Sequence, residues 1–244
     1  MHILETKHLL KRFEGVHAVD RLSLAFERGK ITAVIGPNGS GKTTLVNLLS
    51  GMLPWDSGAV AIDGRVTLAR LAPHEAPAYG ITRTFQEVRL WNQMTVLDNL
   101  LVVLTERNVF SALFERHSAY HLERAEEILK RVGLSEKRHA LAANLSYGQR
   151  KLLEIGRALA MRADILLLDE PFAGLFPEMV KTIVGIVREL RREGKTIVLI
   201  EHNMDLVREL ADHVVVMDGG ELLAEGRPAE VLAKKEVMEA YLGE

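Results

Sequence analysis

Residues 31–45 constrain the fold of this chain more than any other stretch. Ile31 to Ile35 form a short apolar run rich in β-branched side chains, which predicts a buried strand, and Thr44 to Leu49 have the apolar spacing of a helix. The turn between them has the spacing of a phosphate-binding loop (P-loop), Gly36-x-x-x-x-Gly41-Lys42-Thr43. A strand, a glycine-rich loop and a helix in this order predict a site for nucleotide phosphates.

A P-loop binds phosphate because its glycines let successive backbone N–H groups converge on the phosphate oxygens, and the helix adds the positive end of its dipole. We expect the Lys42 ammonium to reach the β- and γ-phosphates and the Thr43 hydroxyl to bind Mg²⁺. The alternative is a chance glycine turn, against which the flanking elements argue. The predicted nucleotide-binding residues of the loop are Gly36, Pro37, Asn38, Gly39, Ser40, Gly41, Lys42, Thr43 and Thr44.

The composition limits the class of protein and its partners. A chain of 244 residues can bury a full core and suits one α/β domain with a smaller appendage. The net charge of -2 gives no general attraction to nucleic acid, and no such partner is expected. The absence of cysteine excludes disulfides and thiolate metal sites. We see no signal peptide and no apolar run of about 18 residues, so we expect a soluble chain that meets a membrane only through partners.

Strand and helix patterns alternate along most of the chain and predict an α/β fold with a mainly parallel sheet. Residues 3–13 and 17–26 alternate apolar with polar side chains, which predicts an N-terminal antiparallel β subdomain. Strand signals stop between residues 87 and 144, where we predict an inserted helical subdomain, and the nucleotide-binding core is then 1–86 and 145–244. Helices are predicted over 96–106, 119–132, 150–162, 179–192, 204–210 and 228–242.

Polar residues follow the predicted strands of the core at the ends where ligands bind in such sheets. Asp169 and Glu170 close an apolar run, and because neighbouring side chains of a strand point to opposite faces, the two carboxylates have different tasks. We expect Asp169 to hold Mg²⁺ through water, and Glu170 to polarise or deprotonate the water that attacks the γ-phosphate. The alternative is a pair of solvated acids at the start of a loop.

Two further residues at strand ends are candidates for the same reaction. Gln86 can accept a hydrogen bond from a Mg²⁺-bound water and donate one to the γ-phosphate or to the attacking water. His202 follows the predicted strand 196–200 and can donate a hydrogen bond to the γ-phosphate. Ordinary polar residues at strand ends are the alternative for both.

Phe13 lies in the first predicted hairpin, where an exposed ring can stack on a base for roughly 1–3 kcal/mol. Val19 is expected to pack against the same ring, and both are candidate nucleotide contacts. The alternative places Phe13 in the core of the hairpin.

Leu145 to Gln149 is hard to explain within one monomer. Ser146, Gly148 and Gln149 lie at the start of a predicted helix, where a hydroxyl, backbone N–H groups and the helix dipole make a second anion site. A second site has a purpose if it closes over the nucleotide of another copy, as a two-fold dimer permits. The alternative is a capping turn only.

Together these motifs resemble an ABC ATPase, the nucleotide-binding subunit of an ABC transporter. The resemblance covers the whole chain, residues 1–244, as a single ABC ATPase domain with the P-loop NTPase fold. The family's motifs occur in its order and are Walker A at 36–43, the Q-loop at Gln86, the signature at 145–149, Walker B at 165–169 with the catalytic glutamate Glu170, and the H-loop at His202. Phe13 falls at the A-loop position that stacks adenine.

The resemblance implies ATP hydrolysis with ATP and Mg²⁺, and a dimer in which Walker A of one copy and the signature of the other enclose each ATP. It implies transmembrane permease subunits, a second ATPase subunit in a homo- or heterodimer, and a cytoplasmic, peripheral place on the inner face of the cell membrane. The stretches 82–99, 145–154 and 169–175 resemble the branched-chain amino acid importer branch, to which urea importer and lipopolysaccharide exporter ATPases are similar.

Two residues depart from the family pattern. Tyr147 replaces the commoner glycine of the signature, which this branch tolerates, and Phe176 stands where the D-loop usually has Asp or Asn. We hypothesise that Phe176 packs against the partner copy in a dimer. Trp91, Met94 and Leu97 are candidates for a groove that receives a helix of a membrane subunit, or else for the core of the helical subdomain.

Two other classes of function compete with transport. A soluble ABC ATPase that acts on ribosomes or DNA usually has two fused cassettes or a long coiled coil, for which residues 87–144 are too short. A P-loop small-molecule kinase needs an acceptor pocket and leaves the stretch 145–149 without a purpose.

Overall fold

The computed structural model describes residues 1–85, 88–104 and 119–242. The chain divides into two compact units. The sheet unit consists of Met1–Arg83, Asp164–Pro171 and Val187–Glu244, and the helical unit of Thr84–Ala163 and Phe172–Ile186.

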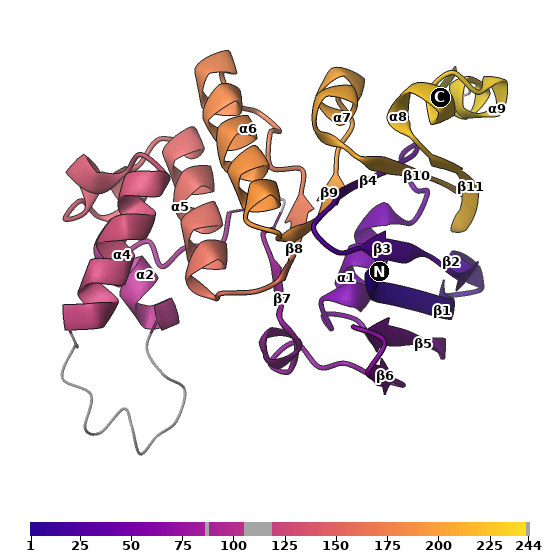
Figure 1. Ribbon diagram of the computed structural model, residues 1–244, viewed down its shortest axis with the longest axis horizontal. Coiled ribbons are helices and arrows are strands. Elements are labelled where there is room, and N and C mark those ends of the chain that lie inside the picture. Colours follow the sequence, from indigo (N-terminus) through magenta and orange to yellow (C-terminus); the bar gives the residue numbers. More distant parts are fainter. Residues whose placement is uncertain (86–87, 105–118, 243–244) are drawn as a thin grey trace. The chain divides into compact units, whose positions relative to one another are not determined.

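In the sheet unit, six of the described strands form one sheet in the order β11-β10-β4-β9-β8-β7 (Figure 1). Their bounds are β4 (Ile31–Ile35), β7 (Ile81–Arg83), β8 (Ile165–Asp169), β9 (Thr196–Ile200), β10 (His213–Asp218) and β11 (Glu221–Gly226). The strands from β10 to β7 run parallel to their neighbours, and β11 is antiparallel to β10. The prediction of a mainly parallel sheet is confirmed.

The register of the sheet places the carboxyl-terminal ends of three neighbouring strands at the same level. β4, β8 and β9 are buried along their whole length, as strands covered on both faces should be. Asp169 at the end of β8 is aligned with Ile200 of β9, and Ile200 is aligned with Val34 of β4. The loop that begins at Gly36 and the residues after Asp169 and Ile200 therefore leave the sheet side by side.

A second, antiparallel sheet has the order β2-β1-β5-β6, with β3 also paired to β1. Its strands are β1 (His2–Phe13), β2 (Val16–Leu22), β3 (Ala25–Glu27), β5 (Ser57–Ile62) and β6 (Val66–Leu68). The N-terminal antiparallel pair is confirmed, but its second strand, expected over 17–26, is split. At the split, the Thr6 hydroxyl donates to Leu22 O at 2.9 Å and accepts from Leu24 N at 2.8 Å, so a side chain bonds to these two backbone groups.

The helices of the sheet unit are short, and one prediction for them is wrong. They are α1 (Lys42–Leu49), α7 (Met204–Leu210), α8 (Pro228–Val231), α9 (Lys235–Leu242) and the 3₁₀ helix η1 (Ala76–Tyr79). A single helix was expected over 228–242, whereas α8 and α9 are separate. Val231 and Val237 both pack into the apolar cluster around β10. Residues six apart in one straight helix point in different directions, so the break lets both valines reach that cluster.

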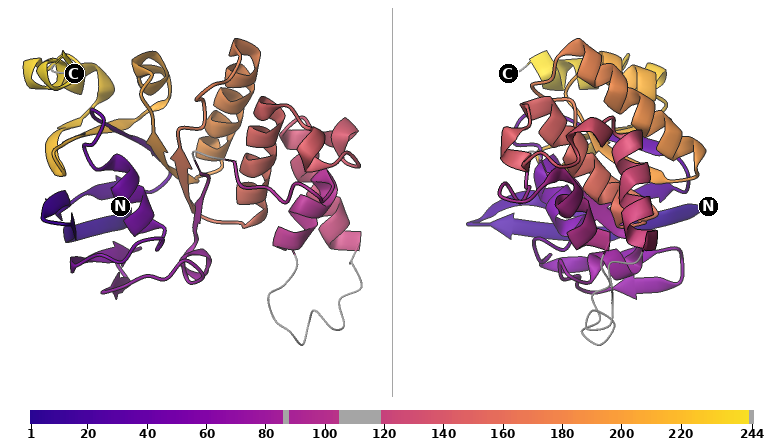
Figure 2. Two further views of the ribbon diagram at one scale, coloured as in Figure 1. Left: turned by 180° about the vertical axis from the view of Figure 1, so that it is seen from behind. Right: turned by 90° about the vertical axis from the view of Figure 1, so that its left-hand side faces the viewer.

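The helical unit contains α2 (Val96–Leu104), α4 (Ala119–Arg131) and α5 (Tyr147–Ala160), which lie side by side (Figures 1 and 2). The 3₁₀ helices η2 (Ser135–Lys137) and η3 (Ala142–Asn144) connect α4 to α5, and α6 (Pro177–Arg192) contributes residues to both units. The unit thus includes α5 as well as the predicted insertion, whose bounds of 87–144 stay a prediction. Residues 105–118, within that insertion, lie outside the described residues.

Candidate functional site

The glycine-rich loop after β4 has a backbone that only glycine fits at two positions. Gly36 and Gly41 have φ angles of +149° and +97°. A Cβ on Gly36 would lie 2.1 Å from Met217 O, and a Cβ on Gly41 would lie 2.1 Å from Ala18 O. The close approach of β10 to Gly36 and of β2 to Gly41 therefore requires glycine at both positions, whether or not a ligand is bound.

Backbone hydrogen bonds hold this loop from outside. Gly220, in the turn between β10 and β11, donates its N–H to Ser40 O at 3.2 Å, and Asp20 of β2 donates to Gly220 O at 2.9 Å. Backbone hydrogen bonds therefore connect β2 to the turn, and the turn to the glycine-rich loop. The loop conformation is thus stabilised by contacts within the sheet unit.

Lys42 opens α1 and is buried against the loop. Its ammonium donates to Gly36 O at 2.8 Å, to Pro37 O at 2.7 Å and to Ser40 Oγ at 3.3 Å. Thr43, in the first turn, is exposed. The residue before the helix, Gly41, has no side chain that could cap the first N–H groups of α1. This helix start therefore presents backbone donors and a positive charge, which suits an anion.

Asp169 at the end of β8 is buried and forms an ion pair that the sequence did not predict. Arg83 Nη2 lies 2.8 Å from Asp169 Oδ2, and both side chains are almost fully buried. The sequence feature that could have indicated this pair is Arg83 itself, a charged residue at the end of β7, which is the neighbour of β8 in the sheet. Reasoning from motifs missed it because Arg83 has no role in a spacing pattern.

The structure brings Glu170 and His202 together. Glu170 Oε1 lies 2.8 Å from His202 Nε2. Glu170 has a φ of +46°, a strained value for a residue with a Cβ, and its N–H donates to Ile200 O at 3.1 Å. This turn directs the Glu170 side chain away from the strand and towards the histidine that follows β9.

Glu201 supports this arrangement and was also missed from sequence. Its buried carboxylate accepts from His202 N at 2.9 Å and from Asn203 N at 3.0 Å. Burial raises the pKa of Glu201 above its usual range, against the two backbone hydrogen bonds, which lower it. Glu201 thereby fixes the backbone that carries His202.

Replacing Glu201 with Gln should increase stability relative to the native chain as the pH rises. Because the pKa of Glu201 is raised on folding, its contribution to the free energy of unfolding falls as the pH rises through the ordinary and then the raised pKa. Glutamine can accept the same two N–H bonds and does not titrate. Urea unfolding at about pH 4 and about pH 8 should show that E201Q gains stability relative to the native chain at the higher pH. The control E209Q, at an exposed site, should show no such gain, and a pH-independent difference for E201Q would show that titration of the buried carboxylate is not the cause.

The structure separates the two members of the predicted base-stacking pair. Phe13 ends β1, is 43% exposed and has the Lys11 ammonium 5.3 Å from its ring centroid. Its partner across the hairpin is Val16, whereas Val19 is opposite Lys11 and fully buried. The alternative that placed Phe13 in the core of the hairpin is therefore wrong, because the Phe13 ring is exposed, whereas Val19 is a core residue.

In the helical unit, Ser146 and Gln149 form a capping box at the start of α5. Ser146 Oγ accepts from Gln149 N at 3.4 Å, and Ser146 N donates to Gln149 Oε1 at 3.1 Å. A Cβ on Gly148 would lie 2.9 Å from Met179 Cγ, so this glycine permits close packing with α6. The capping turn is real, and it explains why α5 begins at Tyr147 instead of the expected residue 150. A nucleotide contact by these residues stays a prediction. Gln86 lies outside the described residues.

The profile of a known family, described as ABC transporter, matches residues 19–173, which is more than half of the chain. The chain belongs to the ABC transporter family. ABC ATP-binding proteins hydrolyse ATP, and this chain is an ATPase of that type with the expected α/β fold. No helix in the described part of the chain is long and apolar enough to cross a membrane.

Relatives within the ABC family cover nearly the whole chain. A high-affinity branched-chain amino acid transport ATP-binding protein, LivG of Salmonella typhimurium, is 40% identical over 99% of this chain and 98% of its own length. A crystal structure of the ADP conformation of an ABC transporter cassette is 38% identical, with a TM-score of 0.88 over 100% of both chains. A dimeric cassette in a post-hydrolysis state, bound to ADP and Pi, is 25% identical, with a TM-score of 0.80 over 93% of this chain and 99% of that one.

The residues of this ABC ATPase fit Mg²⁺ held together with a nucleotide. Thr43 offers a hydroxyl and Asp169 a carboxylate, which are the hard oxygen ligands that Mg²⁺ prefers. The described residues contain no group of three or more His, Asp or Glu side chains that could hold a metal alone. Mg²⁺ typically takes one or two protein ligands and completes its coordination with water and phosphate oxygens.

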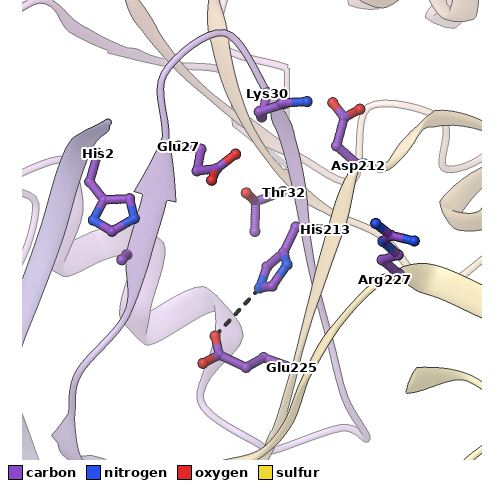
Figure 3. A pocket seen from close by; sticks show the side chains of 9 residues that line it. His2, Glu27, Lys30, Thr32, Asp212, His213, Glu225 and Arg227 are labelled. Atoms are coloured by element: carbon purple, nitrogen blue, oxygen red, sulfur yellow. Dashed lines mark hydrogen bonds and ion pairs between the residues drawn. The ribbon is translucent and has the colours of Figure 1, made fainter. Parts of the chain in front are cut away.

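A cavity of the ABC ATPase lies at the amino-terminal ends of the strands, opposite the ends that carry the P-loop and Asp169. Its volume is about 560 Å³, and its walls include Thr32 at the start of β4 and His213 at the start of β10. His213 Nε2 lies 3.4 Å from Glu225 Oε2. Figure 3 shows this pair among acidic and basic side chains that line the cavity. Ligands of parallel sheets bind beyond the carboxyl ends of the strands, where the P-loop lies. This cavity is at the other ends and is therefore distinct from the P-loop site.

Proposed function

We propose that this chain binds ATP with Mg²⁺ and hydrolyses it to drive a transporter of branched-chain amino acids or related small solutes. The observation that carries the proposal is the shared edge of β4, β8 and β9, at which the P-loop, Asp169 and the Glu170–His202 pair leave the sheet. LivG of Salmonella typhimurium supports the choice of cargo by its name. The urea, lipopolysaccharide, ribosome and DNA alternatives have no comparable support.

The P-loop residues Gly36 to Thr44 bind the phosphates in this proposal. Lys42 exchanges its bonds to the loop carbonyls for bonds to phosphate oxygens, and the N–H groups at the start of α1 donate to the same anion. Thr43, Asp169 and Gln86 would hold Mg²⁺, directly or through water. The bound metal would neutralise part of the negative charge of the phosphates. Phe13 stacks on the base, with Val19 supporting the hairpin beneath it.

Glu170 acts as the general base of hydrolysis. Its carboxylate orients the attacking water and takes its proton, while the single Nε2–H of His202 is shared between this carboxylate and an oxygen of the γ-phosphate. Gln86 orients the same water. Glu201 fixes the backbone of His202, so the histidine needs no rearrangement before it acts.

Two copies of an ATPase subunit, identical or different, form the working dimer. Ser146, Gly148 and Gln149 of one copy complete the nucleotide site of the other, for which the dimeric cassette bound to ADP and Pi gives support. Closure follows ATP binding because these contacts to the γ-phosphate exist only in the closed dimer, and hydrolysis removes them.

Permease subunits receive the motion, and the chain is a peripheral protein on the cytoplasmic face of the membrane. Trp91 and Met94 are exposed in the helical unit and offer apolar surface to a permease helix, whereas Leu97 is partly buried. The test is copurification from detergent-solubilised membranes. A permease whose reconstituted complex transports branched-chain amino acids with ATP is the expected result, and an ATPase that recovers only ribosomes or DNA would refute the assignment.

Replacing Phe176 with Asn should weaken ATP-dependent dimerisation. Phe176 is 84% exposed, the most exposed of the large apolar side chains in the described residues. Burying a phenylalanine is worth about 1.5–3 kcal/mol, so the dimer dissociation constant should rise roughly tenfold or more. Analytical ultracentrifugation with ATP measures the effect, using E170Q to prevent turnover and M238N as a control for surface apolarity. Unchanged or tighter dimerisation by F176N would show that Phe176 does not pack against the partner.

A further inference from the structure

We propose that Arg83 is a positioning residue that fixes the magnesium-binding carboxylate of Asp169 relative to the P-loop helix α1. The proposal rests on the proposed function, because it assigns a role towards Mg²⁺ to a residue that no motif includes. It concerns side chains of the sheet unit only.

One guanidinium contacts two elements at the same time. Arg83 Nη2 donates to Asp169 Oδ2 on β8 at 2.8 Å, while Nη1 donates to Asn47 Oδ1 and, at 3.2 Å, to Ser50 Oγ, both at the C-terminal part of α1. The Arg83 side chain is 7% exposed and that of Asp169 is 2% exposed. Water therefore competes little for these bonds, and the bridge between strand and helix is firm.

The helical period connects this bridge to Thr43. Residues 43, 47 and 50 are spaced i, i+4 and i+7, so Thr43 lies on the same face of α1 as the two side chains that Arg83 contacts. Because Arg83 bonds to both Asn47 and Asp169, it fixes the position of the helix face that carries Thr43 relative to the Asp169 carboxylate. Thr43 and Asp169 are the proposed magnesium ligands from these two elements.

An arginine is needed for this role because its donors form a rigid planar fork. Two separate nitrogens point in different directions and can bond to a carboxylate and to an amide together. A lysine keeps the positive charge beside Asp169 but offers a single ammonium on a flexible stem. Arg83→Lys therefore separates the geometric role from the effect of charge alone.

The test compares ADP affinity with Mg²⁺ and with excess EDTA, measured by the fluorescence of a labelled ADP. The factor by which Mg²⁺ tightens ADP binding reports how well protein and nucleotide hold the metal together. Arg83→Lys should lower this factor about tenfold and change the metal-free affinity by less than about twofold. Arg188→Lys changes an exposed arginine paired with Glu209 and should leave the factor as in the native chain.

Asn47→Ala is the second variant, because it removes one arm of the bridge and leaves the Arg83–Asp169 pair intact. We expect it to lower the factor by about threefold, and the double variant to be no worse than Arg83→Lys alone, since both changes break the same bridge. Circular dichroism and thermal unfolding of each variant verify that it is folded.

Two results would overturn the proposal while leaving the proposed function intact. An unchanged factor in Arg83→Lys would show that the fork does not position the carboxylate. An equal loss of ADP affinity with and without Mg²⁺ would show a general structural role. If Mg²⁺ does not increase the ADP affinity of the native chain, the proposed function fails together with the inference.

Discussion

Replacing Glu170 with Gln should lower the rate of ATP hydrolysis by at least about 100-fold, because a general base contributes roughly that factor or more. Glutamine cannot take a proton from the attacking water. Its amide oxygen can still contact His202, which lies 2.8 Å from the native carboxylate, so the local geometry is retained. ATP affinity should stay within about twofold of the native value. Phosphate release measures the rate, and labelled ATP measures the affinity.

The same variant should accumulate as a dimer with ATP, since the closed form no longer reopens through hydrolysis. Light scattering should show a doubled mass with ATP and a monomer with ADP. The control E239Q, on the exposed face of α9, should hydrolyse ATP at the native rate. Rapid hydrolysis by E170Q would remove Glu170 from the role of base, and full activity in a strictly monomeric preparation would refute the composite site.

Replacing Gly41 with Ala should nearly abolish nucleotide binding and destabilise the chain. The new Cβ would lie 2.1 Å from Ala18 O, at a φ of +97° that side chains rarely adopt, so the loop or β2 must move. We expect a loss of about 2–4 kcal/mol in the free energy of unfolding. Nucleotide affinity should fall by more than about 100-fold, because the loop N–H groups no longer converge. Urea unfolding and binding of labelled ADP give the two values.

Gly64→Ala is the matched control for this prediction. Gly64 has a φ of +64°, but a Cβ there meets nothing within 4 Å. It should cost about 1 kcal/mol through backbone strain and leave ADP affinity unchanged. If G41A binds ADP as well as G64A does, the close approach of β2 is not what shapes the phosphate site.

Local patterns predicted much of the sheet unit because short, fully apolar runs have few other uses. The runs at 31–35, 165–169 and 196–200 became β4, β8 and β9 with the expected bounds, and the helix expected over 204–210 is α7. The strand pattern of the sequence runs from Ile81 to Phe85, immediately before Gln86, but β7 ends at Arg83. Phe85 N donates to the Glu154 carboxylate at 3.0 Å and so leaves the ladder.

The candidate site was predictable to the extent that its residues belong to spacing motifs. The structure places Glu170 beside His202, but it does not pair Phe13 with Val19. Arg83 and Glu201 were missed, since each acts through a contact with a residue distant in sequence or through burial. Gln149 forms the helix-capping bond that the alternative interpretation of residues 145–149 predicted, and its contact with a nucleotide stays a prediction.

The sequence by itself determined the class of fold, the phosphate loop and the strand ends that carry charged residues, because these depend on residues close together in the chain. Only the tertiary structure decided which side chains meet: Arg83 with Asp169 across 86 residues, and Ala18 with Gly41 at the distance that forbids a Cβ. Such contacts follow from strand order and register, which are set by packing of the whole core and leave no local pattern.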